Sequence, residues 1–374
     1  VDQGADDDIL VSGPTTARNV DIGKVRVRDV STVLARYSLS GDISSVNILQ
    51  GSVNARSVVS ASASGFIGTL SKGGASTYIN HDAFIIQVHD SSGNERQDLR
   101  QVLIARKPSY YIADAFSYTT GDLSLDNEGN ITAAISFLGE LEVGDVNLKS
   151  KGIGFDMALI KWNDNGDLLW IKHLSDGESL YPVKVKTLSD GMTILSGMYR
   201  GSLSVDDQEI APGDQFIASF DKQGNVNWLS EIGANFDHMG RIYFDEMQDG
   251  RLAIAGEYYG TGSIGSTTIS GFGGNTSNNN SDIYLHFVDS VDGSEAIREI
   301  FVSSLRMNTK EGYPIVYRIS RATQGRELYW EITTDGEAGD QIFYGSTIGF
   351  LEGDLLQAEI TVIPKLDGVT EGIR

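Results

Sequence analysis

The stretch KWNDNGDLLWIKHL, residues 161–174, joins two runs of apolar residues through a polar turn that ends at Gly166. An Asn or Asp at the start of a turn can bond its own backbone two residues on, and Gly supplies the positive φ that closes the turn. We therefore expect a β-hairpin here. A calcium loop is the alternative, because Asn163, Asn165 and Asp167 place oxygens at alternate positions. The bidentate acid that completes such a loop is missing from the sequence that follows.

This hairpin turn recurs along the chain. SFDKQGNVNWLSEI, residues 219–232, has the same order of apolar run, polar turn, Gly and Trp. Turns of this kind end at Gly41, Gly93, Gly166, Gly224 and Gly293, with a degenerate copy near Gly353. A second kind of polar turn precedes a run of small β-forming residues. Turns of this second kind end at Gly129, Gly191, Gly250 and, more loosely, Gly325. An aromatic or bulky pair before a Gly is a third mark, found at Gly68, Gly139, Gly201 and Gly260.

The repeat predicts the fold. Four antiparallel strands in each unit of about fifty to seventy residues are typical of a β-propeller blade. We expect an all-β chain in which residues 1–374 form one domain, a single β-propeller of four-stranded antiparallel blades with six blades. Part of a seven- or eight-bladed ring is the alternative. The Trp after the turn, such as Trp170, is expected on the fourth strand, where it fills the wedge between neighbouring blades.

Both ends of the chain fit the same repeat. Residues 1–13 align without a gap on residues 244–256, so the chain is expected to begin within a first strand. Residues 368–374 align on residues 237–243, so tail and head would together complete one strand and close the ring. The Gly-, Ser- and Asn-rich segment 261–282 interrupts blade five between its second and third strands. We expect it to be a mobile excursion or a docking place for another module.

The charge balance limits the partners. The chain has 29 Lys and Arg against 51 Asp and Glu, a net charge of −22, and no Cys. Such a field repels phosphate backbones and anionic membranes, so no nucleic-acid partner is expected. No apolar run reaches the length of a membrane span, so direct membrane insertion is not expected. The absence of Cys excludes disulfides and thiolate metal sites. The start at Val1 predicts a processed chain or one part of a larger chain or assembly.

Two segments resemble a known family. They are ISFLGELEVGDVNLKSKGIGFDMALIKWNDNGDLLWIKHL, residues 135–174, and SGMYRGSLSVDDQEIAPGDQFIASFDKQGNVNWLSEIG, residues 196–233. Both resemble the SBBP-type β-propeller repeats of bacterial secreted and surface proteins. The resemblance extends over residues 120–300, and towards both ends Ser, Arg or Ile replaces the Trp. It implies an extracellular binding or scaffold module, sometimes within large adhesins, and it carries no catalytic signature.

The candidate site lies on the face formed by the connections between blades and by the loops between second and third strands. These segments gather tyrosines and basic residues in a chain that is otherwise acidic. Tyr offers flat apolar area with a polar tip, and Arg offers forked donors for carboxylates or sulfates. The predicted ligand-binding residues are Arg106, Lys107, Tyr110, Tyr111, Tyr181, His238, Arg241, Arg306 and Tyr313. The alternative is that these side chains pack as lids over the core.

The leading functional hypothesis is a secreted or cell-surface binding or adhesion module that recognises glycan, matrix or a partner protein. The alternatives are a polysaccharide-active enzyme, either a glycosidase or a lyase, and a structural spacer of a larger adhesin. No catalytic residue is predicted, because Asp206 and Asp207, if on a strand, would point to opposite faces. The histidines show no metal spacing, so no cofactor is expected, and Ca²⁺ stays an open alternative.

Overall fold

The computed structural model describes residues 2–3, 9–14, 19–27, 32–38, 40–49, 57–61, 67–74, 81–90, 95–106, 121–152, 154–233, 238–247, 249–264, 267–270, 282–293, 300–304, 315–321, 328–331, 343–344, 348–351 and 357–364. The chain divides into two compact units, Val1–Glu231 and Ile232–Arg374, and each is described by itself. The described residues form antiparallel strands and one short 3₁₀ turn, η1 (Gln97–Leu99). The expectation of an all-β antiparallel chain is confirmed. None of these residues belongs to a helix long and apolar enough to cross a membrane.

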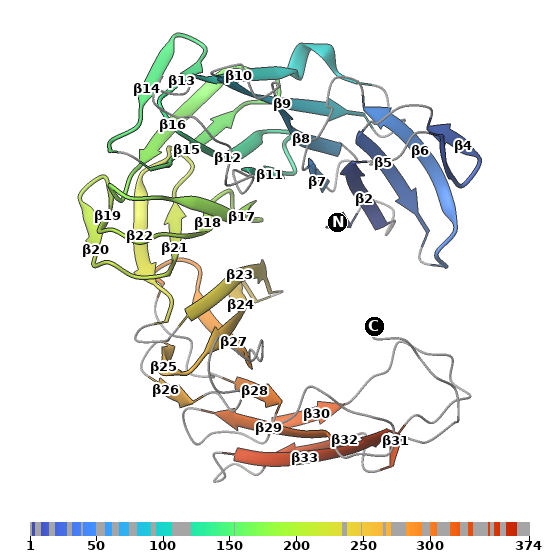
Figure 1. Cartoon of the computed structure of the whole chain (residues 1–374), viewed down its shortest axis with the longest axis vertical. Helices are drawn as coiled ribbons and strands as arrows, with labels where there is room; N and C mark the ends of the chain where they lie inside the picture. Colours follow the sequence, from blue (N-terminus) through green and yellow to red (C-terminus); the bar gives the residue numbers. More distant parts are fainter. Residues whose placement is uncertain are drawn as a thin grey trace. The chain divides into compact units, whose positions relative to one another are not determined.

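The described residues of the first unit form four large antiparallel sheets, numbered here in chain order, and two separate two-stranded ones (Figure 1). In each sheet, consecutive main strands are hydrogen-bonded neighbours. Sheet 1 has β1 (Asp2–Gln3), β2 (Ile9–Pro14), β5 (Thr32–Tyr37) and β6 (Ile43–Leu49). Sheet 2 has β7 (Ser57–Ala61), β8 (Ile67–Gly74), β9 (His81–His89) and β10 (Gln101–Arg106). Sheet 3 has β11 (Gly121–Leu125), β12 (Ile131–Phe137), β15 (Asp156–Trp162) and β16 (Leu168–Leu174). Sheet 4 has β17 (Tyr181–Thr187), β18 (Thr193–Met198), β21 (Gln215–Phe220) and β22 (Val226–Glu231).

A small hairpin stands between the second and third strands of three of these sheets. These hairpins are β3 (Val20–Ile22) with β4 (Val25–Val27), β13 (Glu140–Val143) with β14 (Val146–Lys149), and β19 (Leu203–Val205) with β20 (Gln208–Ile210). Each has a two-residue turn whose first residue has positive φ: 57° at Gly23, 55° at Gly144 and 51° at Asp206. The expectation of Asp206 and Asp207 on a strand is therefore wrong. They form the turn, because Asp tolerates the left-handed conformation that this turn requires.

The second unit begins with a sheet of the same plan. Its main strands are β23 (His238–Glu246), β24 (Arg251–Tyr259), β27 (Asp282–Asp289) and β28 (Ile300–Ser304). The predicted excursion lies between β24 and β27, and its first part is the hairpin of β25 (Thr261–Ile264) and β26 (Thr267–Ser270). The strands β29 (Ile315–Arg321), β33 (Gln357–Pro364) and β31 (Phe343–Tyr344) extend this sheet, whereas β30 (Leu328–Glu331) pairs with β32 (Ile348–Leu351). These later strands do not repeat the plan, so six blades stay a prediction.

The polar turns have the predicted chemistry. Asn163 Oδ1 accepts hydrogen bonds from the backbone N–H of Asn165 (3.0 Å) and of Asp167 (2.8 Å), and Gly166 has φ +83°. The turns that start at Asp126 and Asp221 repeat this arrangement. The hairpin prediction is confirmed, and the side-chain oxygens of Asn163 and Asp167, two of the three that a calcium loop would use, accept hydrogen bonds within the turn. Among the described residues, no group of three or more His, Asp or Glu could hold a metal ion.

The start of the chain pairs as the internal alignment predicts. Asp2 lies opposite Leu10, in the register of Asp245 opposite Ala253 in the second unit. Residues 2–3 therefore pair with β2 as a first strand does. The predicted pairing of the head with residues 368–374 lies outside the described residues.

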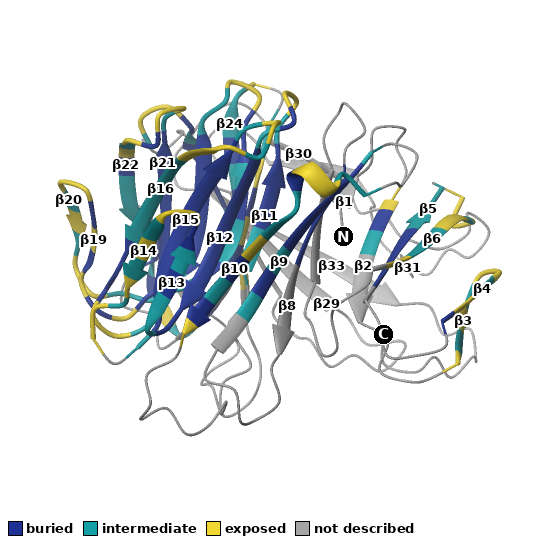
Figure 2. Cartoon of the chain, turned by 90° about the horizontal axis from the view of Figure 1, so that it is seen from above, coloured by how far each residue is buried: buried dark blue, intermediate teal, exposed yellow. Residues whose placement is uncertain are grey.

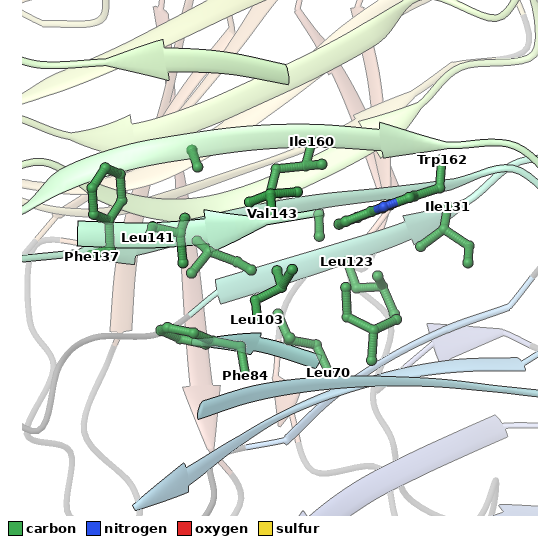
Figure 3. Close-up of a cluster of buried hydrophobic side chains, with 14 of the residues drawn as sticks. Leu70, Phe84, Leu103, Leu123, Ile131, Phe137, Leu141, Val143, Ile160 and Trp162 are labelled. Carbon is green, nitrogen blue, oxygen red and sulfur yellow. The ribbon is translucent and has the colours of Figure 1, made fainter. Parts of the chain in front are cut away.

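Sheets 2, 3 and 4 of the first unit pack through two apolar clusters, and a smaller one of Leu10, Leu34 and Ile67 joins sheets 1 and 2. Phe84 and Leu103 of sheet 2 lie against Leu123 and Ile160 of sheet 3 (Figure 3). The other cluster joins sheets 3 and 4, and every residue of β12 and β15 is buried because a sheet covers each face (Figure 2). The first strands β7, β11 and β17 are neighbours, and Asp122 Oδ2 on β11 accepts the N–H of Val185 on β17 at 2.7 Å.

Trp170 on β16 lies between sheets 3 and 4, as predicted. Its Nε1 donates to the carbonyl oxygen of Lys222 in the last turn of sheet 4, at 3.0 Å. Its ring stacks on Phe220 with the ring centroids 6.5 Å apart. Trp170, on the fourth strand of sheet 3, thus contacts the turn between β21 and β22 of sheet 4.

Candidate functional site

Three loops meet where the chain passes from sheet 3 to sheet 4. The first precedes β15, the second is the connection Ser175–Leu180, and the third follows β18. A Cβ on Gly152 would lie 2.7 Å from the carbonyl oxygen of Gly177, and a Cβ on Gly201 would overlap the carbonyl oxygen of Asp176. Only Gly allows the backbones to approach this closely. We call the surface of these three loops the connection face.

The buried carboxylate of Asp156 fixes the first of these loops. Its side chain accepts hydrogen bonds from the backbone N–H of Lys151 (2.7 Å), from His173 Nε2 (2.7 Å) and from Ser175 Oγ (2.9 Å). Asp156 is only 2% exposed. A carboxylate can be buried at such a position only when its oxygens are satisfied, as they are here. Asp156 therefore ties the loop before β15 to the end of β16.

A second buried carboxylate fixes the other two loops. Asp176 accepts the backbone N–H groups of Arg200 (2.8 Å) and Gly201 (3.1 Å) at Oδ2, and that of Glu178 (2.9 Å) at Oδ1. It is 7% exposed. Charge-assisted hydrogen bonds of this kind are about twice as strong as neutral ones. The connection between the sheets is thus joined rigidly to the loop after β18.

The two carboxylates anchor the backbones of two exposed cations. Lys151 and Arg200 each give a backbone N–H to one buried carboxylate, and both residues are exposed. Neither side chain forms an ion pair with any residue that the structure describes. The connection face therefore presents two exposed cationic side chains on loops whose backbones are held by buried carboxylates. Such an arrangement can receive an anionic group, because the positions of the backbones are set before binding.

A pair of acids lies beside the same loop. Glu231 ends β22 and is half-buried, and burial raises the pKa of its carboxyl, with the charge of Asp214 adding to the effect. The neighbouring Tyr199 donates its hydroxyl to the carbonyl oxygen of Ala211 at 2.9 Å. Burial, and then the charges of Glu231 and Asp214, raise the pKa of that hydroxyl. A carboxyl with a raised pKa holds its proton more readily than a free one, which suits a general acid.

The structure describes two side chains of the predicted ligand-binding set. Arg106 is the last residue of β10, and its guanidinium binds Glu142 on β13 at 2.9 Å. Tyr181 is the first residue of β17, is half-buried, and packs its ring on Phe155 at 5.7 Å between centroids. Both were expected in loops, whereas Arg106 is the last residue of β10 and Tyr181 the first of β17. Their ligand roles stay predictions.

The remaining predicted residues are not brought together by described side chains. His238 and Arg241 belong to β23 rather than to a loop, with a register shift between Met239 and Ile242, and their side chains lie outside the described residues. The others lie wholly outside the described residues: Lys107, Tyr110, Tyr111, Arg306 and Tyr313.

The sequence reasoning missed Lys151 and Arg200. Arg200 stands in the mark of an aromatic or bulky pair before Gly, YRG at residues 199–201, so a signal was present. Nothing local marks Lys151. Its importance follows from Asp156, whose contacts reach across the sheet to residues 173 and 175.

No protein-family model matches the chain, and no curated protein matches it. Among solved structures, two mutant forms of levansucrase from B. megaterium are similar to it at 9% sequence identity. The first has a TM-score of 0.30 and covers 83% of this chain and 83% of that chain. The second has a TM-score of 0.26 and covers 77% of this chain and 81% of that chain. Scores this low carry no argument about fold or function.

Proposed function

We propose that the chain forms a single six-bladed β-propeller of the SBBP-type repeat kind and acts as a secreted or cell-surface binding module. The four regular sheets of the first unit support the blade plan, because their first strands are neighbours and β12 and β15 are covered on both faces. The six turn marks in the sequence support the count. A propeller exposes its inter-blade connections on one face, and binding sites are commonly built on loops held by a rigid scaffold.

The ligand proposed for the connection face is an acidic glycan or an acidic segment of a matrix or partner protein. The single observation that carries this proposal is the pair Lys151 and Arg200, exposed cations held by buried Asp156 and Asp176 in a chain of net charge −22. Lys151 and Arg200 would attract an anion to these loops against the repulsion of the net negative charge. The guanidinium of Arg200 can bind a carboxylate or sulfate with two parallel hydrogen bonds. The ring of Tyr181 packs on Phe155, the residue that precedes β15.

Calorimetric titration with defined polysaccharides tests this function. The probes are a sulfated polysaccharide, a polyuronate and neutral dextran. The intact chain should bind the two anionic probes, and Lys151→Ala with Arg200→Ala should weaken the binding by about tenfold or more. Lys24→Ala with Lys222→Ala removes the same charge from exposed positions away from these loops and is the matched control. Equal weakening by both pairs would show non-specific charge attraction and would refute the site.

A second candidate is a polysaccharide-active enzyme, favoured by Glu231 beside Asp214. Glycoside hydrolysis uses a pair of carboxyl groups, of which the general acid has a raised pKa, as Glu231 has. A screen for release of reducing sugar from the same polysaccharides tests it, with Glu231→Gln as the variant. Turnover that Glu231→Gln abolishes would favour the enzyme, whereas binding without turnover favours the binding module.

A further inference from the structure

Tyr181 lies between two of the three loops of the connection face. On one side, the backbone N–H of Leu180 donates to the carbonyl oxygen of Phe155 at 2.8 Å. The ring of Tyr181 packs on the ring of Phe155 with the centroids 5.7 Å apart. On the other side, Tyr181 lies opposite Met198 in the pairing of β17 with β18. The tyrosine therefore contacts both the end of the loop before β15 and the start of the loop after β18.

The two exposed cations of the connection face belong to the same two loops. Lys151 precedes Phe155 in the loop before β15, and buried Asp156 accepts its backbone N–H at 2.7 Å. Arg200 follows Met198 at the end of β18, and its backbone N–H is likewise held by a buried carboxylate. An aromatic ring thus stands between the loops of two cations, and the backbones of both loops are fixed.

The ring of Tyr181 has a buried support and reaches solvent. Phe155 is only 6% exposed, whereas Tyr181 is half-buried. Tyrosine offers a flat apolar area with a polar tip, and it loses little conformational freedom on binding because only two side-chain torsions must be fixed. A half-exposed ring on a rigid support is suited to stack against a flat apolar face of a ligand.

Charge alone gives the connection face little affinity for an anion. Glu178 is also exposed, on the connection between sheets 3 and 4, and its carboxylate offsets part of the attraction of Lys151 and Arg200. Attractions between exposed charges are weak and are screened by physiological salt. Stacking on Tyr181 adds an apolar contact that salt does not screen. The ligand that suits these loops best therefore combines negative charges with an apolar face.

An acidic sugar has both properties in one rigid unit. A pyranose ring presents C–H groups on its face, and a uronate carries its carboxylate directly on that ring. The apolar face and the charge are fixed relative to each other, so little freedom is lost on binding. The carboxylates of an acidic peptide are attached to flexible side chains, whose rotamer freedom is lost on binding, and these side chains have no ring to stack on Tyr181. The arrangement favours an acidic glycan over an acidic protein segment.

We propose that the connection face binds a polyuronate chain, with one pyranose ring stacked on Tyr181 and carboxylates of this ring or its neighbours bound by Lys151 and Arg200. The inference rests on the proposed function of this face and narrows its ligand to an acidic glycan. Tyr181 sets the specificity for a sugar ring, whereas the two cations attract the anion to the loops.

Calorimetric titration of the intact chain with polygalacturonate and with poly-L-glutamate, at physiological salt and equal carboxylate concentration, tests the inference. Polygalacturonate should bind at least about tenfold more tightly. Tyr181→Leu keeps an apolar side chain but removes the flat ring, and it should weaken the binding of polygalacturonate about tenfold. Tyr181→Phe should retain most of the affinity. Tyr243→Leu removes a tyrosine of β23 that is 51% exposed and is the matched control. Melts followed by circular dichroism check that each variant is folded.

Saturation-transfer NMR with a galacturonate trimer reports the stacking itself. Transfer to the C–H protons of the sugar ring that persists in Tyr181→Phe and falls in Tyr181→Leu supports the inference. Equal weakening by the two substitutions would overturn it, because the hydroxyl and not the ring would then hold the ligand. The comparison of the two polymers in the parent chain decides the case even where Tyr181→Leu does not fold.

Failure of this inference is distinguishable from failure of the proposed function. Poly-L-glutamate that binds as tightly as polygalacturonate, or unchanged affinity in Tyr181→Leu, would overturn the inference alone, provided that Lys151→Ala with Arg200→Ala still weakens the binding of both polymers. If the double variant weakened neither, the proposed anion site would be refuted, and the inference would fall with it.

Discussion

Replacing Asp176 by Ala should destabilise the first unit and weaken ligand binding together. The substitution removes the acceptor of three backbone N–H groups, those of Glu178, Arg200 and Gly201. A buried donor left without a partner costs about 1–3 kcal/mol. Gly201 is buried, whereas water can reach the backbone of the exposed Glu178 and Arg200. We therefore expect a loss of about 3 kcal/mol in the free energy of unfolding, or about 6–12 °C in Tm.

The assay is thermal and guanidinium unfolding followed by circular dichroism, combined with titration of the sulfated polysaccharide. Asp207→Ala is the control, because Asp207 is an exposed turn residue, and it should change Tm by no more than about 1 °C. Affinity should fall in Asp176→Ala even at temperatures where the variant is folded, because Arg200 loses its anchor. A change in stability as small as that of Asp207→Ala would refute the role given to this carboxylate.

The remaining predictions concern Trp170 between sheets 3 and 4, the raised pKa of Glu231, and the net charge of the chain. Trp170→Ala should lower the free energy of unfolding by about 3 kcal/mol in denaturant titration, because it removes the contacts with Phe220 and Lys222. The control Leu169→Ala replaces an exposed neighbour and should lower it by less than about 1 kcal/mol. Burial raises the pKa of Glu231, so the ionisation of this carboxyl opposes folding. Glu231→Gln should therefore raise Tm relative to the parent at pH 7. In a series of melts at different pH values, the difference should vanish below about pH 4.3, where the carboxyl is protonated in the unfolded chain as well. A difference that persists at low pH would contradict that sign. Salt should raise Tm, because a net charge of −22 repels itself, and a flat salt series would mean that the acids are locally compensated.

The turns could be predicted from sequence because their chemistry is local. Asn163 and Gly166 contain within four residues both the acceptor and the positive φ that the hairpin needs. The position of Trp170 followed from the strand order that these turns define. Asp206 was assigned to a strand because a two-residue hairpin turn leaves little mark when neither residue is Gly.

The candidate site was harder to predict because its contacts are not local. Asp156 acts through His173 and Ser175, and Asp176 acts through Arg200 and Gly201. Arg106 was predicted as a ligand residue. In the structure, the hairpin between β12 and β15 pairs with β10 of sheet 2 and places Glu142 beside Arg106. In the last part of the chain the marks at Gly325 and Gly353 are loose, and there the strand order departs from the repeat.

The most direct measurement of the central claim is a hydrogen-exchange map of the intact chain with and without the tightest-binding anionic polysaccharide. The account predicts slower exchange in residues 150–152, 176–178 and 199–202, which form the connection face, with no change in the turns at residues 163–167 and 221–225. Slower exchange confined to those turns, or an unchanged map in the presence of saturating ligand, would contradict the proposal that Lys151 and Arg200 hold the ligand.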